Sequence, residues 1–427
     1  MKAWTSFVVK DRGKLDFSVI FISISLVVYP ATLLSVPKIN GLIFALFSIA
    51  GLFFLFANRH KSAQNSRDEA LFYSAVILFF FSTLLITMYG GFVYKVLGKY
   101  IHLLLAIPVY IYLRQSGVKL FSLWFGLVIG SIASAGVAIY DVWVLHIPRA
   151  QGFNNAIIFG NLSLVMGCMS MAGFGWFIQR ANWQVIFPVF ALTCGVLASV
   201  LSGTRGGWVA VPVIIVVLFW YIKPHFSLKQ QSLAVMLLFV FLGAMYLLPQ
   251  TGISNQIDRT VESIQQYTDT SEHSMRRVTS VSARLDMWQA SWNMFIDNPI
   301  LGVGWGHYAE QAKLQADQGL FNKKAILFDH PHSEYFSALA NGGSLGFISL
   351  MLLFLIPAWL FIKTIKQGKS ADTRRLALAG LVLVVSYMVF GLTEPMLYRS
   401  RSVNFFAFYL AVFMAAIYQE NNKGVSR

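Results

Sequence analysis

Charged side chains are scarce in this chain. Of its 427 residues only 12% are Asp, Glu, Lys or Arg, whereas 57% are hydrophobic. Soluble domains carry about twice that share of charge. Repeated apolar runs of membrane-spanning length accompany the shortage. The composition therefore excludes an ordinary soluble domain and indicates a polytopic membrane protein, in which lipid replaces water around most of the chain.

Cysteine and acidic residues are also few. The two cysteines, Cys168 and Cys194, lie inside apolar runs, which is typical of small packing residues and indicates no redox compartment. Against 18 acidic residues stand 33 Lys and Arg, for a net charge of +15. These cations are spread over short loops and form no basic domain. We therefore expect membrane lipids as partners and no nucleic acid.

The apolar runs predict an all-α membrane protein with about 12 transmembrane helices. Basic residues precede the first run and no small-residue cleavage site follows it, which favours a retained signal-anchor. No internal repeat is visible. The predicted spans are 16–36, 41–57, 70–88, 98–114, 119–141, 154–178, 184–201, 207–223, 231–249, 338–363, 376–393 and 402–418.

The distribution of Lys and Arg predicts the orientation. If the N-terminus is cytoplasmic, 19 of these cations lie in cytoplasmic segments and 7 in short outer loops. This bias places both termini in the cytoplasm. The long segment after the ninth span, which carries ten of the 18 acidic residues, then lies in the periplasm. We accordingly expect helices 1–9 over residues 1–249, a periplasmic loop over 250–337, and helices 10–12 with a short tail over 338–427.

Two stretches of the predicted loop have recognisable patterns. In SARLDMWQASWNMF (282–295) the apolar side chains recur at helical spacing, so we expect an amphipathic helix along the membrane surface. NPILGVGWG (298–306) then ends the helix with Pro and Gly. The loop is expected to fold onto the bundle as a lid. The apolar stripe of the helix consists of Leu285, Trp288, Trp292 and Phe295.

Several cations are expected on the outer face, against the usual bias. Arginines in short outer loops can cap a helix or extend toward lipid headgroups. Alternatively, converging guanidiniums bind a phosphate or pyrophosphate bidentately. The turn LSGTRGGW favours the second interpretation for Arg205, because Gly206 and Gly207 would let a bulky ligand approach the backbone. The outer-face residues are Arg149, Arg205, Arg284, His332, Arg399 and Arg401.

The stretch HPHSEY (330–335) places a titratable cluster ahead of the tenth span. The imidazoles can be structural, hydrogen-bonded at a helix start. His330, His332 and Glu334 can also form a metal site, although no further ligands stand out. The third interpretation is a general base that deprotonates a hydroxyl nucleophile. A helix continued from His332 would carry Tyr335 on the same face, and Gly343 with Gly346 would permit close helix contact.

TRGG (204–207), SARLDMW (282–288), the P-x-L-G-x-G-W-G turn and H-x-H-S-E-Y together resemble the O-antigen ligase family. This superfamily also contains O-antigen polymerases and protein O-oligosaccharyltransferases. The resemblance implies a GT-C-like fold with one large periplasmic loop between helices 9 and 10. It also implies an inner-membrane enzyme whose active site faces the periplasm.

The implied reaction is glycosyl transfer without metal or cofactor. The donor would be a polysaccharide on undecaprenyl pyrophosphate, and the acceptor a sugar hydroxyl of lipid A–core. The family's two arginines and one histidine match Arg205, Arg284 and His332. An O-antigen polymerase, a protein O-oligosaccharyltransferase and a secondary transporter are the alternatives. Substrate contacts are expected from Arg149, His330, Arg399, Arg401 and Tyr335.

Overall fold

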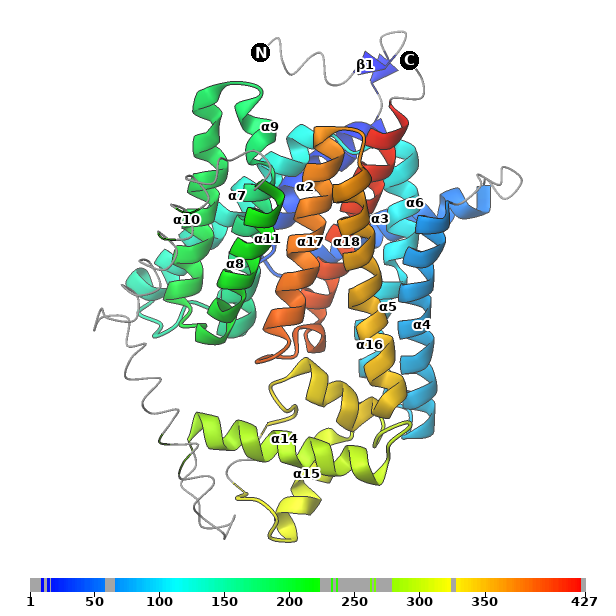
Figure 1. The fold of residues 1–427 in the computed structure, drawn as a ribbon, viewed down its shortest axis with the longest axis vertical. Coiled ribbons are helices and arrows are strands. Elements are labelled where there is room, and N and C mark those ends of the chain that lie inside the picture. The colour runs from blue at the N-terminus through cyan, green and yellow to red at the C-terminus, as the bar shows by residue number, and fades with distance from the viewer. Residues whose placement is uncertain are drawn as a thin grey trace. The chain divides into compact units, whose positions relative to one another are not determined.

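The structure is a computed structural model that describes residues 9–10, 14–15, 17–57, 66–222, 279–323 and 328–423, with single positions at 232, 236, 262 and 265. Apart from one antiparallel pairing of β1 (Val9–Lys10) with β2 (Lys14–Leu15), the described elements are helices (Figure 1). The chain divides into two compact units. Unit 1 comprises Met1–Leu84, Tyr94–Ile215 and Ser349–Arg427, and unit 2 comprises Leu85–Val93 and Val216–Ile348.

Most helices belong to unit 1. Several are interrupted by a residue or a turn, as between α5 and α6, which together are long and apolar enough to form one span. Helices α4 and α16 begin in one unit and end in the other. The helices are α2 (Phe17–Thr32), α3 (Ile39–Ala57), α4 (Arg67–Tyr89), α5 (Tyr94–Leu104), α6 (Ala106–Ser116), α7 (Leu120–Ile139), η1 (Tyr140–Val144), α8 (Ala156–Ala172), α9 (Phe174–Ile178), η2 (Asn182–Val185), α10 (Ile186–Leu201), η3 (Arg205–Val209), α11 (Ala210–Ile222), α16 (Glu334–Gln367), α17 (Ala371–Phe390), η7 (Met396–Tyr398) and α18 (Ser400–Asn422).

The helices match the predicted spans. Eight are long and apolar enough to cross a membrane, and three shorter apolar helices accompany them. Together they coincide with 11 of the 12 predicted spans. Of the ninth, 231–249, the structure describes only positions 232 and 236, so the count of 12 stays a prediction. The all-helical membrane fold is confirmed.

Helix α18 lies at the centre of unit 1. Its apolar window is 89% buried, whereas that of α3 is 33% buried. It packs against α17, α6 and α5, and Figure 1 shows it in red beside α17. Because a lipid-facing helix leaves apolar side chains uncovered, the exposed Leu42 and Phe53 of α3 mark the outer surface of the bundle. Because α18 packs against these neighbours, the residues at its start are held in place by the bundle.

A buried ion pair ties three helix ends in unit 1. Arg114 of α6 lies 2.6 Å from a carboxylate oxygen of Glu69 in α4 and donates to the Tyr418 hydroxyl in α18 at 2.8 Å. Tyr110 donates to the same carboxylate. Both charged side chains are nearly inaccessible to solvent. Such a pair is tolerated because every charge has a partner.

Unit 2 contains two helices of the predicted loop and the start of α16. Helix α14 (Ser280–Asp297) begins with a capping box of Thr279 and Ser282, and α15 (Tyr308–Asp317) follows. The helix predicted at 282–295 is confirmed. Its buried face consists of small and flexible side chains, whereas the predicted apolar stripe is half-buried or exposed, with Trp292 43% exposed. That the stripe lies along the membrane surface stays a prediction. The core cluster of this unit is Ala290, Met294, Tyr308, Ala312, Phe321 and Ala340.

The glycine-rich turn 298–306 packs against α16 where that helix is interrupted. Gly343 has φ 57° and ψ −154°, which interrupts the helix. The freed carbonyl oxygens of Ala340 and Asn341 accept hydrogen bonds from the amides of Val303 and Gly304 at 2.9 and 3.1 Å. The prediction that Gly343 serves close helix contact is therefore wrong. It is glycine because a Cβ there would lie 2.5 Å from the Ile300 backbone and because this conformation is essentially restricted to glycine.

Candidate functional site

In unit 1 a buried carboxylate shapes the loop that carries Arg149. Helix α7 ends in the π-helical turn η1, which contains Asp141. One carboxylate oxygen of Asp141 accepts from the amides of Gln151 and Gly152 at 2.8 and 2.7 Å. Asp141 is only 4% exposed. Since π-helical turns often mark functional positions, Asp141 joins Arg149 as a candidate residue of the site.

Arg149 reaches the turn that precedes Arg205. Its Nε donates to the carbonyl oxygen of Ser202 at 2.8 Å, and the amide of Ala150 donates to Leu201 at 3.0 Å. Gly203 adopts φ +64° directly beneath this guanidinium. The structure thus brings together two of the predicted outer loops. Arg149 has five donors, so these contacts orient the guanidinium and leave its outer edge exposed.

The TRGG turn is held by its own hydroxyls. The Thr204 hydroxyl donates to the carbonyl of Ala156 at 2.9 Å and lies 2.7 Å from the Ser202 hydroxyl. Arg205 begins η3 and is exposed. The turn therefore presents one guanidinium outward from a rigid base.

The two glycines of this turn serve internal packing. A Cβ on Gly206 would lie 2.6 Å from the Thr393 hydroxyl oxygen, and one on Gly207 would lie 2.1 Å from the amide oxygen of Asn161. The expectation that they admit a ligand to the backbone is wrong, because protein atoms already occupy that space. Sequence alone cannot distinguish a ligand from the chain's own side chains.

The two remaining arginines lie at the start of α18, Arg399 directly before the helix and Arg401 in its first turn. Arg401 donates to the carbonyl oxygen of Phe153 at 3.0 Å, which links α18 to the loop that carries Arg149. Arg399 is exposed, and its guanidinium lies 5.3 Å from the centroid of the Tyr398 ring. Unit 1 therefore brings the loops of Arg149, Arg205 and Arg401 into one connected group.

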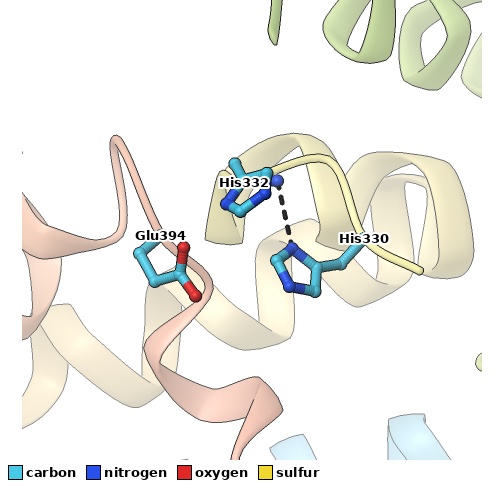
Figure 2. A group of neighbouring side chains, drawn as sticks. All are labelled: His330, His332 and Glu394. Carbon is cyan, nitrogen blue, oxygen red and sulfur yellow. Dashed lines mark hydrogen bonds between the residues drawn. The ribbon is translucent and has the colours of Figure 1, made fainter. Parts of the chain in front are cut away.

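In unit 2 His332 lies outside helix α16, which begins at Glu334, so the prediction that the helix continues from His332 is wrong. His332 has φ +48°, a left-handed conformation that is uncommon for a residue other than glycine. Its amide lies 3.3 Å from Nδ1 of His330, and the ring centroids are 4.5 Å apart. Figure 2 shows this pair and also draws Glu394, which belongs to unit 1.

The two imidazoles have different environments. His330 is only 3% exposed, with Nε2 3.6 Å from a carboxylate oxygen of Asp329. His332 is half-buried and contacts Phe328 edge to face at 4.8 Å. Because a catalytic base must reach its substrate, the more accessible His332 is the better candidate. The metal alternative with Glu334 remains a hypothesis.

Helix α14 connects Arg284 with the histidine segment. Trp288 lies one turn after Arg284 and donates from its indole nitrogen to the carbonyl oxygen of Pro331 at 3.0 Å. Its ring stacks on Phe336 of α16 at 5.1 Å. Arg284 itself is half-buried. The helix that carries one predicted catalytic residue therefore also positions the backbone next to another.

Tyr335 occupies the first turn of α16 and is half-buried, with its ring 6.5 Å from that of Phe347.

Two residues of the site were not predicted from the sequence, Asp141 and Trp288 in its anchoring role. For Asp141 a signal existed, since it is a lone carboxylate at the end of an apolar run. For Trp288 none existed, because its partner is a backbone carbonyl.

Comparison with known proteins agrees with the resemblance. Residues 189–351 match the family described as O-antigen ligase. The chain is 24% identical over 378 residues to an uncharacterized protein of Haemophilus influenzae, covering 88% of this chain and 93% of that protein. It is also 24% identical over 235 residues to an O-antigen ligase of Escherichia coli, covering 54% of this chain and 51% of that protein. The resemblance to the O-antigen ligase family is thereby confirmed.

Proposed function

We propose that this protein is an O-antigen ligase. It transfers O-antigen polysaccharide en bloc from undecaprenyl pyrophosphate to a sugar hydroxyl of lipid A–core. The observation that carries the proposal is that the family match over 189–351 contains all three proposed catalytic residues, Arg205, Arg284 and His332.

Arg205 and Arg284 stabilise the departing pyrophosphate. Pyrophosphate is a good leaving group, so the reaction needs charge stabilisation and no general acid. Guanidiniums stay charged at any physiological pH and bind phosphate oxygens bidentately. The outward position of Arg205 on η3 supports this role. Loss of one such donor commonly slows a reaction by about a hundredfold or more.

His332 removes the proton from the acceptor hydroxyl as the glycosidic bond to pyrophosphate breaks. Attack from the face opposite the leaving group inverts the anomeric centre. The left-handed backbone of His332 supports this role, because strained conformations cluster at functional sites. In this scheme no metal takes part. The substrate contacts are assigned to Arg149, His330, Tyr335, Arg399 and Arg401.

The proposed setting is the inner membrane. The multi-pass helical fold supports a membrane enzyme, and the Lys and Arg bias supports cytoplasmic termini with the active site toward the periplasm. The proposed division is residues 1–249, the loop 250–337 and residues 338–427. An O-antigen polymerase shares the donor and is the first alternative. A protein O-oligosaccharyltransferase shares it too.

The test compares lipopolysaccharide ladders in a strain that lacks this protein. The strain is complemented at matched expression with wild type, Arg205→Ala, Arg284→Ala or His332→Asn. Asparagine is chosen because it tolerates the left-handed backbone. His307→Ala, a histidine of unit 2 outside the proposed machinery, is the matched control and should restore the ladder.

A missing ladder with polymer still on the lipid carrier supports the ligase, and failure of the three variants to restore it supports their roles. Core capped by a single repeat would identify a polymerase. An intact lipopolysaccharide ladder with altered protein glycosylation would identify the oligosaccharyltransferase. A normal ladder with His332→Asn would refute the general base.

A further inference from the structure

Two cations from distant parts of the chain meet on one aromatic ring in unit 1. The Lys99 ammonium lies 4.0 Å from the centroid of the Tyr398 ring, and the Arg399 guanidinium lies 5.3 Å from it. Lys99 belongs to α5 and Arg399 precedes α18, and these two helices pack against each other. The ring attracts each cation through its negative face.

A third cation extends this group. Lys95 lies one turn before Lys99 on the same face of α5 and is exposed. The helix buries its other face through Val96, Tyr100 and Leu103. Like charges four residues apart destabilise a helix by about 0.2–0.5 kcal/mol. Lys95 and Lys99 therefore repel each other on this face of α5 and slightly destabilise the helix.

The cations also repel across the ring. Both lie close enough to one centroid that their separation is within a Debye length of about 10 Å at 0.1 M salt. An anion that contacts both cations offsets this repulsion and gains charge-assisted hydrogen bonds.

The position of the group indicates the source of the anion. Lys95 and Arg399 lie in predicted outer loops and Lys99 lies at the outer end of the predicted span 98–114, where cations run against the positive-inside bias. Tyr398 ends η7, and only Arg399 separates it from the apolar helix α18. Tyrosines are enriched where membrane helices meet lipid headgroups, so we expect this ring at the membrane–water boundary. The nearest abundant anions there are the phosphates of lipids.

We propose that Lys95, Lys99 and Arg399, arranged around the Tyr398 ring, bind a phosphate group of a membrane lipid. The guanidinium contributes a planar fork and the ammonium groups contribute point charges. The phosphate belongs either to a phospholipid headgroup or to a phosphorylated glycolipid. The second source rests on the proposed function, because a glycolipid is the acceptor there. The site itself does not depend on that function.

The test measures lipid binding to the full-length purified protein by native mass spectrometry. The probes are phosphatidylglycerol, bisphosphorylated lipid A and, as a neutral reference, phosphatidylcholine. The variant is Lys99→Gln with Arg399→Gln. Lys366→Gln with Lys369→Gln is the matched control, since it removes the same charge from exposed lysines near the end of α16. Equal thermal unfolding midpoints establish that both variants are folded.

The site variant should bind at least one phosphorylated probe about tenfold more weakly. This corresponds to a loss of about 1.4 kcal/mol in binding free energy. Loss of lipid A binding alone assigns the glycolipid, and equal loss of both phosphorylated probes assigns a general headgroup site. Lys99→Arg should retain binding. If the site variant binds both phosphorylated probes like wild type, or if the control loses as much, the proposal is overturned. Transfer activity is not measured in this experiment. Failure of the lipid-binding proposal is therefore distinguished from failure of the proposed function.

Discussion

The indole nitrogen of Trp288 donates a hydrogen bond to the carbonyl oxygen of Pro331 at 3.0 Å. His332 is the next residue and adopts φ +48°. A side chain of α14 thus holds the backbone that orients the proposed base. A strained conformation persists only where its surroundings determine it, and this hydrogen bond is part of those surroundings.

Trp288→Phe should reduce ladder formation while the protein still accumulates. Phenylalanine keeps the aromatic contact with Phe336 but removes the donor, so we expect a loss of about 1 kcal/mol in stability and a looser His332. Quantified ladders and the thermal unfolding midpoint measure the two effects. Trp292→Phe, on the exposed side of the same helix, is the control. Full transfer by Trp288→Phe at wild-type stability would show that the bond does not position His332.

Gly343→Ala should destabilise the protein by about 1–3 kcal/mol or more. Its backbone conformation disfavours any side chain, and a Cβ would collide with the Ile300 backbone at 2.5 Å. The amount in the membrane fraction and the unfolding midpoint in detergent are the readouts. Gly136→Ala in α7 is the control, because a Cβ there meets nothing within 4 Å. Similar behaviour of the two variants would contradict the assigned role of Gly343.

Asp141→Ala should loosen the loop that carries Arg149. The carboxylate oxygen accepts from two consecutive amides, and hydrogen bonds to a charged group contribute about 1.5–3 kcal/mol. Hydrogen exchange at Gln151 and Gly152 should accelerate. Asp141→Asn retains an acceptor oxygen and should fall between wild type and Ala. Unchanged exchange in Asp141→Ala would mean that other contacts hold the loop.

Arg114→Met should cost about 3–5 kcal/mol, because it leaves the Glu69 carboxylate buried without its charge partner. Combining it with Glu69→Gln removes the uncompensated charge and should recover part of this loss. Unfolding midpoints of the two single variants and the double variant provide the cycle. Strict additivity of the two substitutions would show that the pair is not coupled.

The amphipathic segment 282–295 shows how far pattern reasoning extends. Its period predicted a helix, and α14 confirms that helix. The large apolar residues predict a face along the membrane surface, which stays a prediction, and against the protein the helix buries Ala283, Met287, Ala290 and Met294. Close packing against α15 requires small or adaptable side chains, and large ones are accommodated at the edge of such a contact. Hydrophobic periodicity therefore predicts that a segment is helical more reliably than it predicts which residues pack against the rest of the protein.

The apolar runs by themselves determined that this chain is a helical membrane protein, because every backbone polar group in lipid must be satisfied within the segment that crosses it. Motif order likewise indicated the family. Only the tertiary structure decided which distant residues meet. Lys99 lies against Tyr398, and Trp288 against Pro331. Such contacts depend on helix packing and on backbone groups, which have no signature in the residue pattern.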